Sequence, residues 1–107
     1  MTIAELFEQM PSVFNPAAAA GMNKTFQWNI TGDEPGVWAF KIHDGQGEII
    51  PGGVEKPDVT FTISGKDWLA ITEGTLDGMN AFLTGKLKVN GDMMLAMKLQ
   101  SLFPPRK

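Results

Sequence analysis

The sequence lacks cysteine, any cluster of basic residues and any long apolar run. The absence of cysteine excludes disulfides, thiolate metal sites and a cysteine nucleophile, and it suits a reducing compartment. The nine Lys and Arg are scattered along a chain of net charge −3, so we expect no nucleic-acid partner. No apolar run approaches the roughly 18 residues that a membrane span requires.

The two ends of the chain do not resemble targeting segments. Residues 1–8, Met-Thr-Ile-Ala-Glu-Leu-Phe-Glu, carry acids where a secretory leader has basic residues before an apolar stretch. The last five residues are Phe-Pro-Pro-Arg-Lys, which differ from a peroxisomal Ser-Lys-Leu tripeptide. We therefore expect a cytoplasmic protein.

Catalytic and metal-binding patterns are also missing. The one histidine, His43, stands beside Asp44-Gly45 at a predicted strand end, a position typical of a solvated turn residue. Ser64 fits a helix cap, and no serine occupies a Gly-x-Ser-x-Gly elbow. The acids are dispersed, without the clustered carboxylates or paired histidines of a metal site. We expect no catalytic residue, no cofactor and no metal.

The pattern that is present indicates one α+β domain over residues 1–107. An apolar content of 43% and a charged content of 20% fit a folded globular domain. Helical spacing predicts a helix over residues 3–10, capped by Thr2 and ended by Pro11, followed by a helical turn over residues 16–21. Alternating spacing predicts strands over residues 24–31, 37–43, 48–50, 58–64 and 86–90, with a hairpin turn at Asp44-Gly45. One apolar and one polar face per strand is typical of an antiparallel sheet covered on one side.

Helical spacing returns in the second half of the chain. Ser64 predicts the start of a helix that Gly74 ends, and a second short helix is predicted over residues 77–84. After a turn at Asn90-Gly91, the final helix is expected over residues 92–103. It has two apolar stripes, one of Leu95, Leu99, Leu102 and Phe103, the other of Met93, Met94 and Met97. A helix that is apolar on two sides is buried or has a second apolar partner, and unbranched methionine suits irregular partners.

The inward aromatic residues leave two interpretations open. They are Phe26, Trp28, Trp38, Phe40, Phe61, Trp68, Phe82 and Phe103. They fit a completely packed α+β core, and they fit an apolar cavity enclosed between sheet and helices. Periodicity alone does not separate the two.

Several motifs resemble the sterol carrier protein 2 family. The resemblance rests on Lys56-Pro-Asp-Val-Thr-Phe-Thr-Ile-Ser64, Asp67-Trp-Leu69, Ala81-Phe-Leu-Thr-Gly-Lys-Leu-Lys-Val-Asn-Gly-Asp-Met93 and Leu95-Ala-Met-Lys-Leu99. The predicted strand pair, Thr25-Phe-Gln-Trp-Asn-Ile30 and Gly36-Val-Trp-Ala-Phe-Lys-Ile42, matches more loosely. The resemblance covers essentially the whole chain as a single stand-alone domain.

This resemblance implies a fold and a function. The implied fold is a five-stranded, mainly antiparallel sheet with one face covered by helices that enclose a hydrophobic tunnel. The implied function is non-catalytic binding and transfer of a lipid: a fatty acid, an acyl-CoA, a phospholipid or a sterol. Carried onto matching positions, it nominates as ligand-binding residues Phe82, Leu87, Val89, Met93, Met94, Met97, Leu99 and Leu102, with Trp28, Phe40, Phe61 and Ile63 from the sheet.

Two other functions stay open at this point. The chain fits a structural or interaction module whose Met stripe packs on a partner protein or on a second copy in a homodimer. It also fits an accessory domain that presents lipid or isoprenoid substrates to a partner enzyme. A transient membrane contact, in which Lys86 or Lys88 binds an anionic headgroup, is also open. The alternative is that these lysines are solvated and contact no headgroup.

Overall fold

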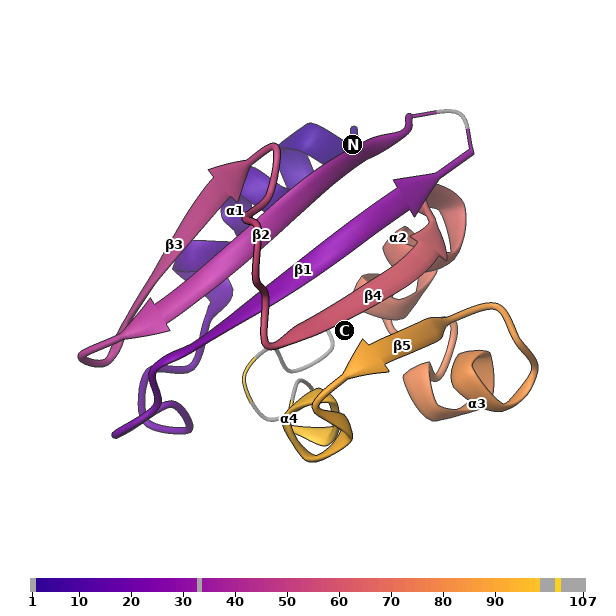
Figure 1. Cartoon of the computed structure of the whole chain (residues 1–107). Coiled ribbons are helices and arrows are strands. Elements are labelled where there is room, and N and C mark those ends of the chain that lie inside the picture. Colours follow the sequence, from indigo (N-terminus) through magenta and orange to yellow (C-terminus); the bar gives the residue numbers. More distant parts are fainter. Residues whose placement is uncertain (1, 33, 99–101, 103–107) are drawn as a thin grey trace.

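The computed structural model describes residues 2–32, 34–98 and 102. This part of the chain forms one five-stranded sheet and four helices (Figure 1). In chain order the elements are α1 (Ile3–Val13), β1 (Lys24–Thr31), β2 (Gly36–His43), β3 (Gln46–Pro51), β4 (Val59–Ser64), α2 (Gly65–Glu73), α3 (Gly78–Leu83), β5 (Lys88–Gly91) and α4 (Met93–Met97).

The strands lie in the order β3-β2-β1-β4-β5. Neighbouring strands are antiparallel except for β1 and β4, which are parallel. The predicted α+β class and the mainly antiparallel five-stranded sheet are therefore confirmed. The predicted hairpin between β2 and β3 is also present, with Asp44 and Gly45 both at positive φ, as a two-residue turn of this kind requires.

A row of apolar side chains crosses the inner face of the sheet. Trp28 of β1 is opposite Trp38 of β2 on one side and Phe61 of β4 on the other. Phe61 is in turn opposite Val89 of β5. This register follows from the alternation of apolar and polar residues, because a shift by one residue would turn every one of these side chains to the other face.

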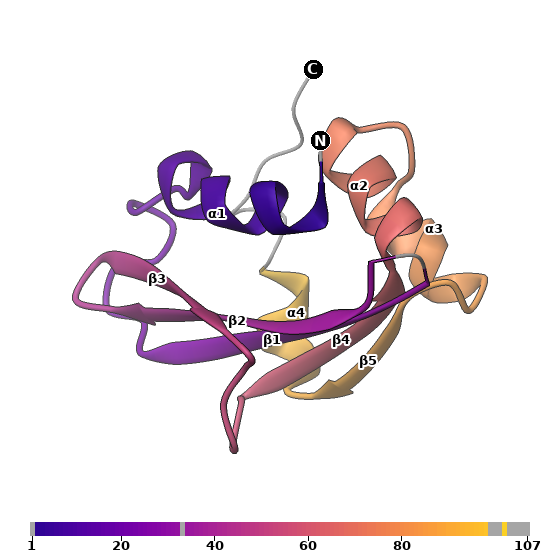
Figure 2. The same ribbon diagram turned by 90° about the horizontal axis from the view of Figure 1, so that it is seen from above.

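The helices cover one face of the sheet. Figure 2 shows α1 and α2 on the same side of the strands, and the connection from β3 to β4 on the opposite side. The ring of Phe7 in α1 lies 5.5 Å from that of Trp28 and 5.2 Å from that of Trp38. On the other face, the backbone N–H of Val54 donates to Oε1 of Gln27 at 2.8 Å and holds the β3–β4 connection against β1.

The first helix corrects the prediction that Pro11 ends it. Thr2 caps α1 as expected, and Glu5 completes a reciprocal capping box. The helix then runs through Pro11 to Val13. Proline removes one backbone N–H donor and crowds the carbonyl four residues earlier. Because Pro11 is in the last turn, only that one hydrogen bond is lost. In the same turn, the Ser12 hydroxyl donates to the Gln9 carbonyl at 2.7 Å.

The junction between β5 and α4 corrects a second prediction. Gly91 belongs to β5, opposite Val59, and is not part of a turn. The helix begins after Asp92, whose side chain accepts the backbone N–H of Leu95 at 3.1 Å. Helix α4 covers Met93–Met97 of the predicted 92–103 range. Leu95 and Leu102 of the predicted Leu stripe are buried, whereas Leu99 and Phe103 lie outside the described residues.

Candidate functional site

An apolar cavity of about 270 Å³ lies between the β4–β5 edge of the sheet and helices α2, α3 and α4. Its side chains come from five separate elements and from the residues that precede β5. The lining residues are Phe61, Trp68, Ile71, Gly78, Met79, Phe82, Leu87, Val89, Met93, Ala96 and Met97. None of these residues carries a formal charge, so the site is built to receive apolar groups.

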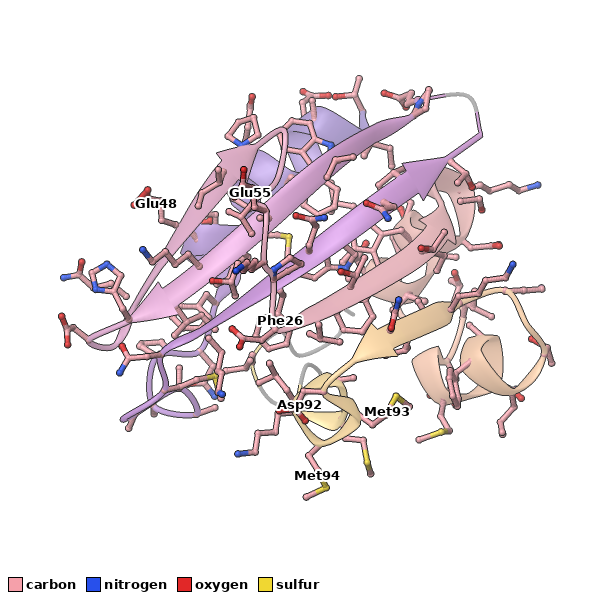
Figure 3. All side chains as sticks on the ribbon, viewed as in Figure 1. Phe26, Glu48, Glu55, Asp92, Met93 and Met94 are labelled. Atoms are coloured by element: carbon pink, nitrogen blue, oxygen red, sulfur yellow. The ribbon has the colours of Figure 1, made fainter. Side chains whose placement is uncertain are left out.

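Local structure explains how each wall is placed. Phe61 and Val89 face each other across β4 and β5 and form the sheet side of the cavity. Met93 and Met97 are one helical turn apart, so they share one face of α4. Figure 3 shows the Met93 side chain extending from α4 towards α3, whereas Met94 points away from the sheet.

Exposure changes steeply from the inner end of the cavity to its mouth. The aromatic residues at the inner end are almost fully buried, with Phe61 2% and Trp68 3% exposed. At the mouth, Met93 is 45% and Met97 65% exposed. The cavity therefore has a rigid aromatic floor and a mouth of unbranched methionine side chains, which change rotamer easily.

The structure brings half of the predicted ligand-binding residues to this cavity. Those lining it are Phe61, Phe82, Leu87, Val89, Met93 and Met97. Their contact with a ligand stays a prediction. The structure adds that these residues, which come from β4, α3, β5 and α4 and the residues before β5, line the same cavity.

The other predicted residues lie elsewhere. Trp28, Phe40, Ile63 and Leu102 are buried in the main core and do not line the cavity. The core position of Trp28 and Phe40 follows from α1 and the segment after it: the Phe7 ring lies 5.5 Å from that of Trp28, and the Phe14 ring is 5.2 Å from that of Phe40.

Two members of the predicted stripes of the last helix also lie away from the cavity walls. Met94 is on the exposed side of α4, since a side chain one residue from Met93 is turned by about 100° around the helix. Leu99 lies outside the described residues.

Five lining residues were absent from the predicted set. They are Trp68, Ile71, Gly78, Met79 and Ala96. Trp68 and Ile71 stand three residues apart on α2, and the inward position of Trp68 had fitted both a packed core and a cavity. No signal in the sequence separates a helix face that meets the sheet from one that stops short of it.

Two buried indole donors lie close to the inner end of the cavity. Among the described residues, Nε1 of Trp28 and Nε1 of Trp68 are buried without a hydrogen-bond partner, and the two rings are 5.4 Å apart. A buried donor without a partner costs about 1–3 kcal/mol. The apolar interior beside the cavity thus contains two N–H donors that have no acceptor among the described residues.

No ionisable side chain is among the residues that line the cavity. The pKa of Glu5 is lowered by hydrogen bonds from the Thr2 backbone N–H and hydroxyl, at the far N-terminal end of α1. His43 is exposed and lies 3.3 Å from the Asp44 carboxylate in the hairpin turn, as expected for a solvated turn residue. Within the described ranges, no three His, Asp or Glu side chains come together as metal ligands.

Two other hollows in the described structure have mixed linings. One of about 340 Å³ lies beside Ile3, Glu34 and Trp38, and Glu34 there accepts the backbone N–H of Ile3 at 3.2 Å. The other, of about 350 Å³, includes His43 and Glu48. Both contain charged or titratable side chains at the surface, which distinguishes them from the apolar cavity at β4–β5. None of the helices in the described ranges is both long and apolar enough to cross a bilayer.

Comparison with known proteins gives a consistent family. The model of the SCP-2 sterol transfer family matches residues 3–104. Sterol carrier protein 2 of Bos taurus is 41% identical over 71 residues, which is 66% of this chain and 13% of that protein. Hydroxysteroid dehydrogenase-like protein 2 of Xenopus tropicalis is 31% identical over 101 residues, 94% of this chain and 24% of that protein. The solution NMR structure of palmitated SCP2L2 from Aedes aegypti is 29% identical, with a TM-score of 0.72, and covers 99% of this chain and 97% of that one.

Proposed function

This chain belongs to the SCP-2 sterol transfer family, and we propose that it binds the acyl chain of a lipid in the cavity between β4, β5 and helices α2 to α4. The observation that carries the proposal is the uncharged lining of this cavity, from Phe61 at its floor to Met97 at its mouth. The family supports lipid binding and transfer in general. The fatty-acid class is our own step, supported by the palmitated relative from Aedes aegypti.

The energetics favour an acyl chain. Each methylene that leaves water contributes about 0.8 kcal/mol. The cavity volume of about 270 Å³ lies at the lower end of the range of about 300–1,000 Å³ for ligand sites. We infer that a long chain widens the mouth by moving the Met79, Met93 and Met97 side chains. Because methylenes differ in little but number, discrimination among acyl chains should be weak.

We propose further that this domain does not catalyse a reaction. Among the lining residues of the cavity there is no acid, base or hydroxyl nucleophile that could move a proton or attack a bond. Some relatives are enzymes by name, but the chain spans only 24% of the Xenopus tropicalis protein. The proposal includes a cytoplasmic location, which suits a chain without cysteine.

The experiment that tests lipid binding uses the purified full chain. Native mass spectrometry of the protein, followed by organic extraction, should reveal bound acyl lipid. A fluorescent fatty acid should bind, and unlabelled palmitate should displace it at one site per chain. A folded protein that neither retains lipid nor binds the fluorescent fatty acid contradicts the proposal.

A second function, protein interaction, is favoured by one observation. Leu83 and Met94 are 72% and 73% exposed and do not line the cavity, so lipid binding alone does not account for them. If they pack on a second copy, light scattering should give the mass of a dimer that Met94→Glu converts to a monomer. If they meet a partner enzyme, the protein alone should stay monomeric and should still bind the fluorescent fatty acid.

A further inference from the structure

The exposed apolar side chains of the described structure are concentrated on two helices. Seven large apolar residues are exposed, and six of them belong to α3 and α4. We call these six the rim: Met79, Phe82, Leu83, Met93, Met94 and Met97. Four of the six also line the cavity. The rim is therefore an exposed apolar surface that surrounds the mouth of the site.

Positive charge gathers in the same part of the chain. Residues 1–77 contain four Lys and eleven Asp and Glu, whereas residues 78–107 contain five Lys and Arg and one acid, Asp92. The Asp92 carboxylate accepts the backbone N–H of Leu95. The rim is thus attached to the basic end of an otherwise acidic protein.

The lysines next to the rim are exposed. Lys86 follows α3, Lys88 is in β5 and Lys98 follows α4. The ion pairs found among the described residues are Lys24–Asp58 and His43–Asp44, and none of these three lysines takes part in them. Their ammonium groups are available to an anionic surface, with flexible stems that can lie along apolar groups.

We propose that the rim docks the cavity mouth on the surface of a bilayer that contains anionic lipids. Apolar side chains of the rim enter the interface, and Lys86, Lys88 and Lys98 meet the headgroups. The proposal rests on the proposed function, because docking at the mouth lets an acyl chain pass between bilayer and cavity without crossing water.

The composition of the rim favours a bilayer over a protein partner. Energetically dominant residues at protein interfaces are enriched in Trp, Tyr and Arg, and residues 78–98 contain none of these. Methionine, leucine and lysine are flexible side chains that make no fixed pattern of hydrogen bonds. A fluid surface of acyl chains and anionic headgroups matches that set without requiring shape complementarity.

Vesicle sedimentation of the full chain tests docking. Vesicles of phosphatidylcholine with phosphatidylglycerol should carry the protein down, and vesicles of phosphatidylcholine alone should carry much less. The double variant Leu83→Ser with Met94→Ser should lose binding to the mixed vesicles about tenfold or more, because two exposed apolar anchors are removed. The control Val37→Thr changes the exposed large apolar residue that, among those the structure describes, lies outside the rim, and it should bind as the unmodified chain does.

A matched pair of charge variants tests the headgroup contact. Each lysine near an anionic surface strengthens binding about fivefold, so Lys86→Gln with Lys98→Gln should weaken it roughly 25-fold. Lys41→Gln with Lys66→Gln makes the same change in net charge on β2 and α2 and should have a much smaller effect. Equal losses in both pairs would reduce the effect to net charge and overturn the assignment of the docking surface.

Different experimental results would contradict the lipid-binding proposal and the docking proposal. Leu83 and Met94 lie outside the cavity, so the Leu83→Ser and Met94→Ser variant should bind the fluorescent fatty acid in vesicle-free solution as the unmodified chain does. If the unmodified chain binds this fatty acid but not the mixed vesicles, docking is overturned and lipid binding stands. If it sediments with vesicles but never binds the fatty acid, the proposed function fails instead. Sedimentation that both double variants leave unchanged would show that another surface of the protein meets the vesicles and would overturn docking through the rim.

Discussion

Phe61 of β4 lies directly opposite Val89 of β5 in the antiparallel register, and both side chains line the same apolar cavity. On its other side Phe61 is opposite Trp28, which is buried in the main core. The same row of inward side chains therefore belongs to the core at one end and to the cavity at the other. The change occurs where α1 no longer covers the sheet.

Replacement of Met97 by glutamate should abolish tight binding of the fluorescent fatty acid. The new carboxylate would stand at the mouth of an uncharged cavity, near a ligand that carries a carboxylate itself. Loss of contact with two methylenes alone, at about 0.8 kcal/mol each, weakens binding about fifteenfold. Met94→Glu is the matched control, because Met94 is on the same helix, is also exposed and does not line the cavity. Unchanged binding in a folded Met97→Glu protein would remove α4 from the ligand site.

Replacement of Gly91 by alanine should destabilise the fold and displace α4. Gly91 has φ of 115°, and a Cβ there would come within 2.6 Å of the Asp58 carbonyl oxygen. Positive φ alone costs an alanine about 1–2 kcal/mol, and the clash adds to it. Gly21→Ala is the control, because Gly21 also has positive φ but has no atom within 4 Å of the added Cβ. Urea denaturation should show a larger loss of unfolding free energy for Gly91→Ala than for Gly21→Ala.

Tryptophan fluorescence should report ligand entry through one residue. Of the three tryptophans, Trp68 lines the cavity, whereas Trp28 and Trp38 do not. A brominated fatty acid should therefore quench mainly Trp68. Because the Trp28 ring is 5.4 Å from that of Trp68, some quenching should remain in Trp68→Phe, but it should be much weaker than in the unmodified chain and in Trp38→Phe. Quenching that is as strong in Trp68→Phe as in the unmodified chain would place the acyl chain elsewhere in the molecule.

Acid should weaken the start of α1 through Glu5. Hydrogen bonds from Thr2 lower the pKa of this carboxyl below its ordinary value of 4.5. The folded-state pKa is therefore below the unfolded-state pKa, so the contribution of Glu5 is present above 4.5 and disappears as the pH falls through the folded-state value. Glu5→Gln should be less stable than the unmodified chain at neutral pH, and the difference in urea denaturation should shrink in acid. A difference that does not change with pH would assign the effect to packing.

Local features of the fold could be predicted because they depend on neighbours in sequence. The apolar alternation of Phe26, Trp28 and Ile30 fixes a strand and its inner face, and Ser64 and Gly74 mark the ends of α2. The hairpin at Asp44-Gly45 follows from the positive φ that both residues tolerate. Two local signals failed. The cost of Pro11 depends on its position within the helix, and Asn90-Gly91 pairs with β4 as part of β5 and does not form a turn.

The candidate site could be predicted only in part. The stripe of Met93 and Met97 predicted a second apolar partner for the last helix, the family resemblance implied a tunnel there, and both residues line a cavity. Trp28 and Phe40 carry the same inward signal as Phe61, yet they are core residues. Their difference from Phe61 arises from which helix lies above each strand, and a single strand contains no information about that.

The sequence by itself determined the helices and strands and the inner face of each strand. It also showed that the last helix has more apolar surface than contact with one core requires. These properties follow from backbone geometry and from the spacing of apolar residues. The tertiary structure decided where sheet and helices touch and where they separate. Coverage by α1 and by Phe14, which follows it, buries Trp28 and Phe40, whereas the space between β5, α3 and α4 leaves Phe61 and Val89 beside a cavity with Met93 and Met97 at its mouth. Such a space results from the packing of residues distant in sequence, which local periodicity does not contain.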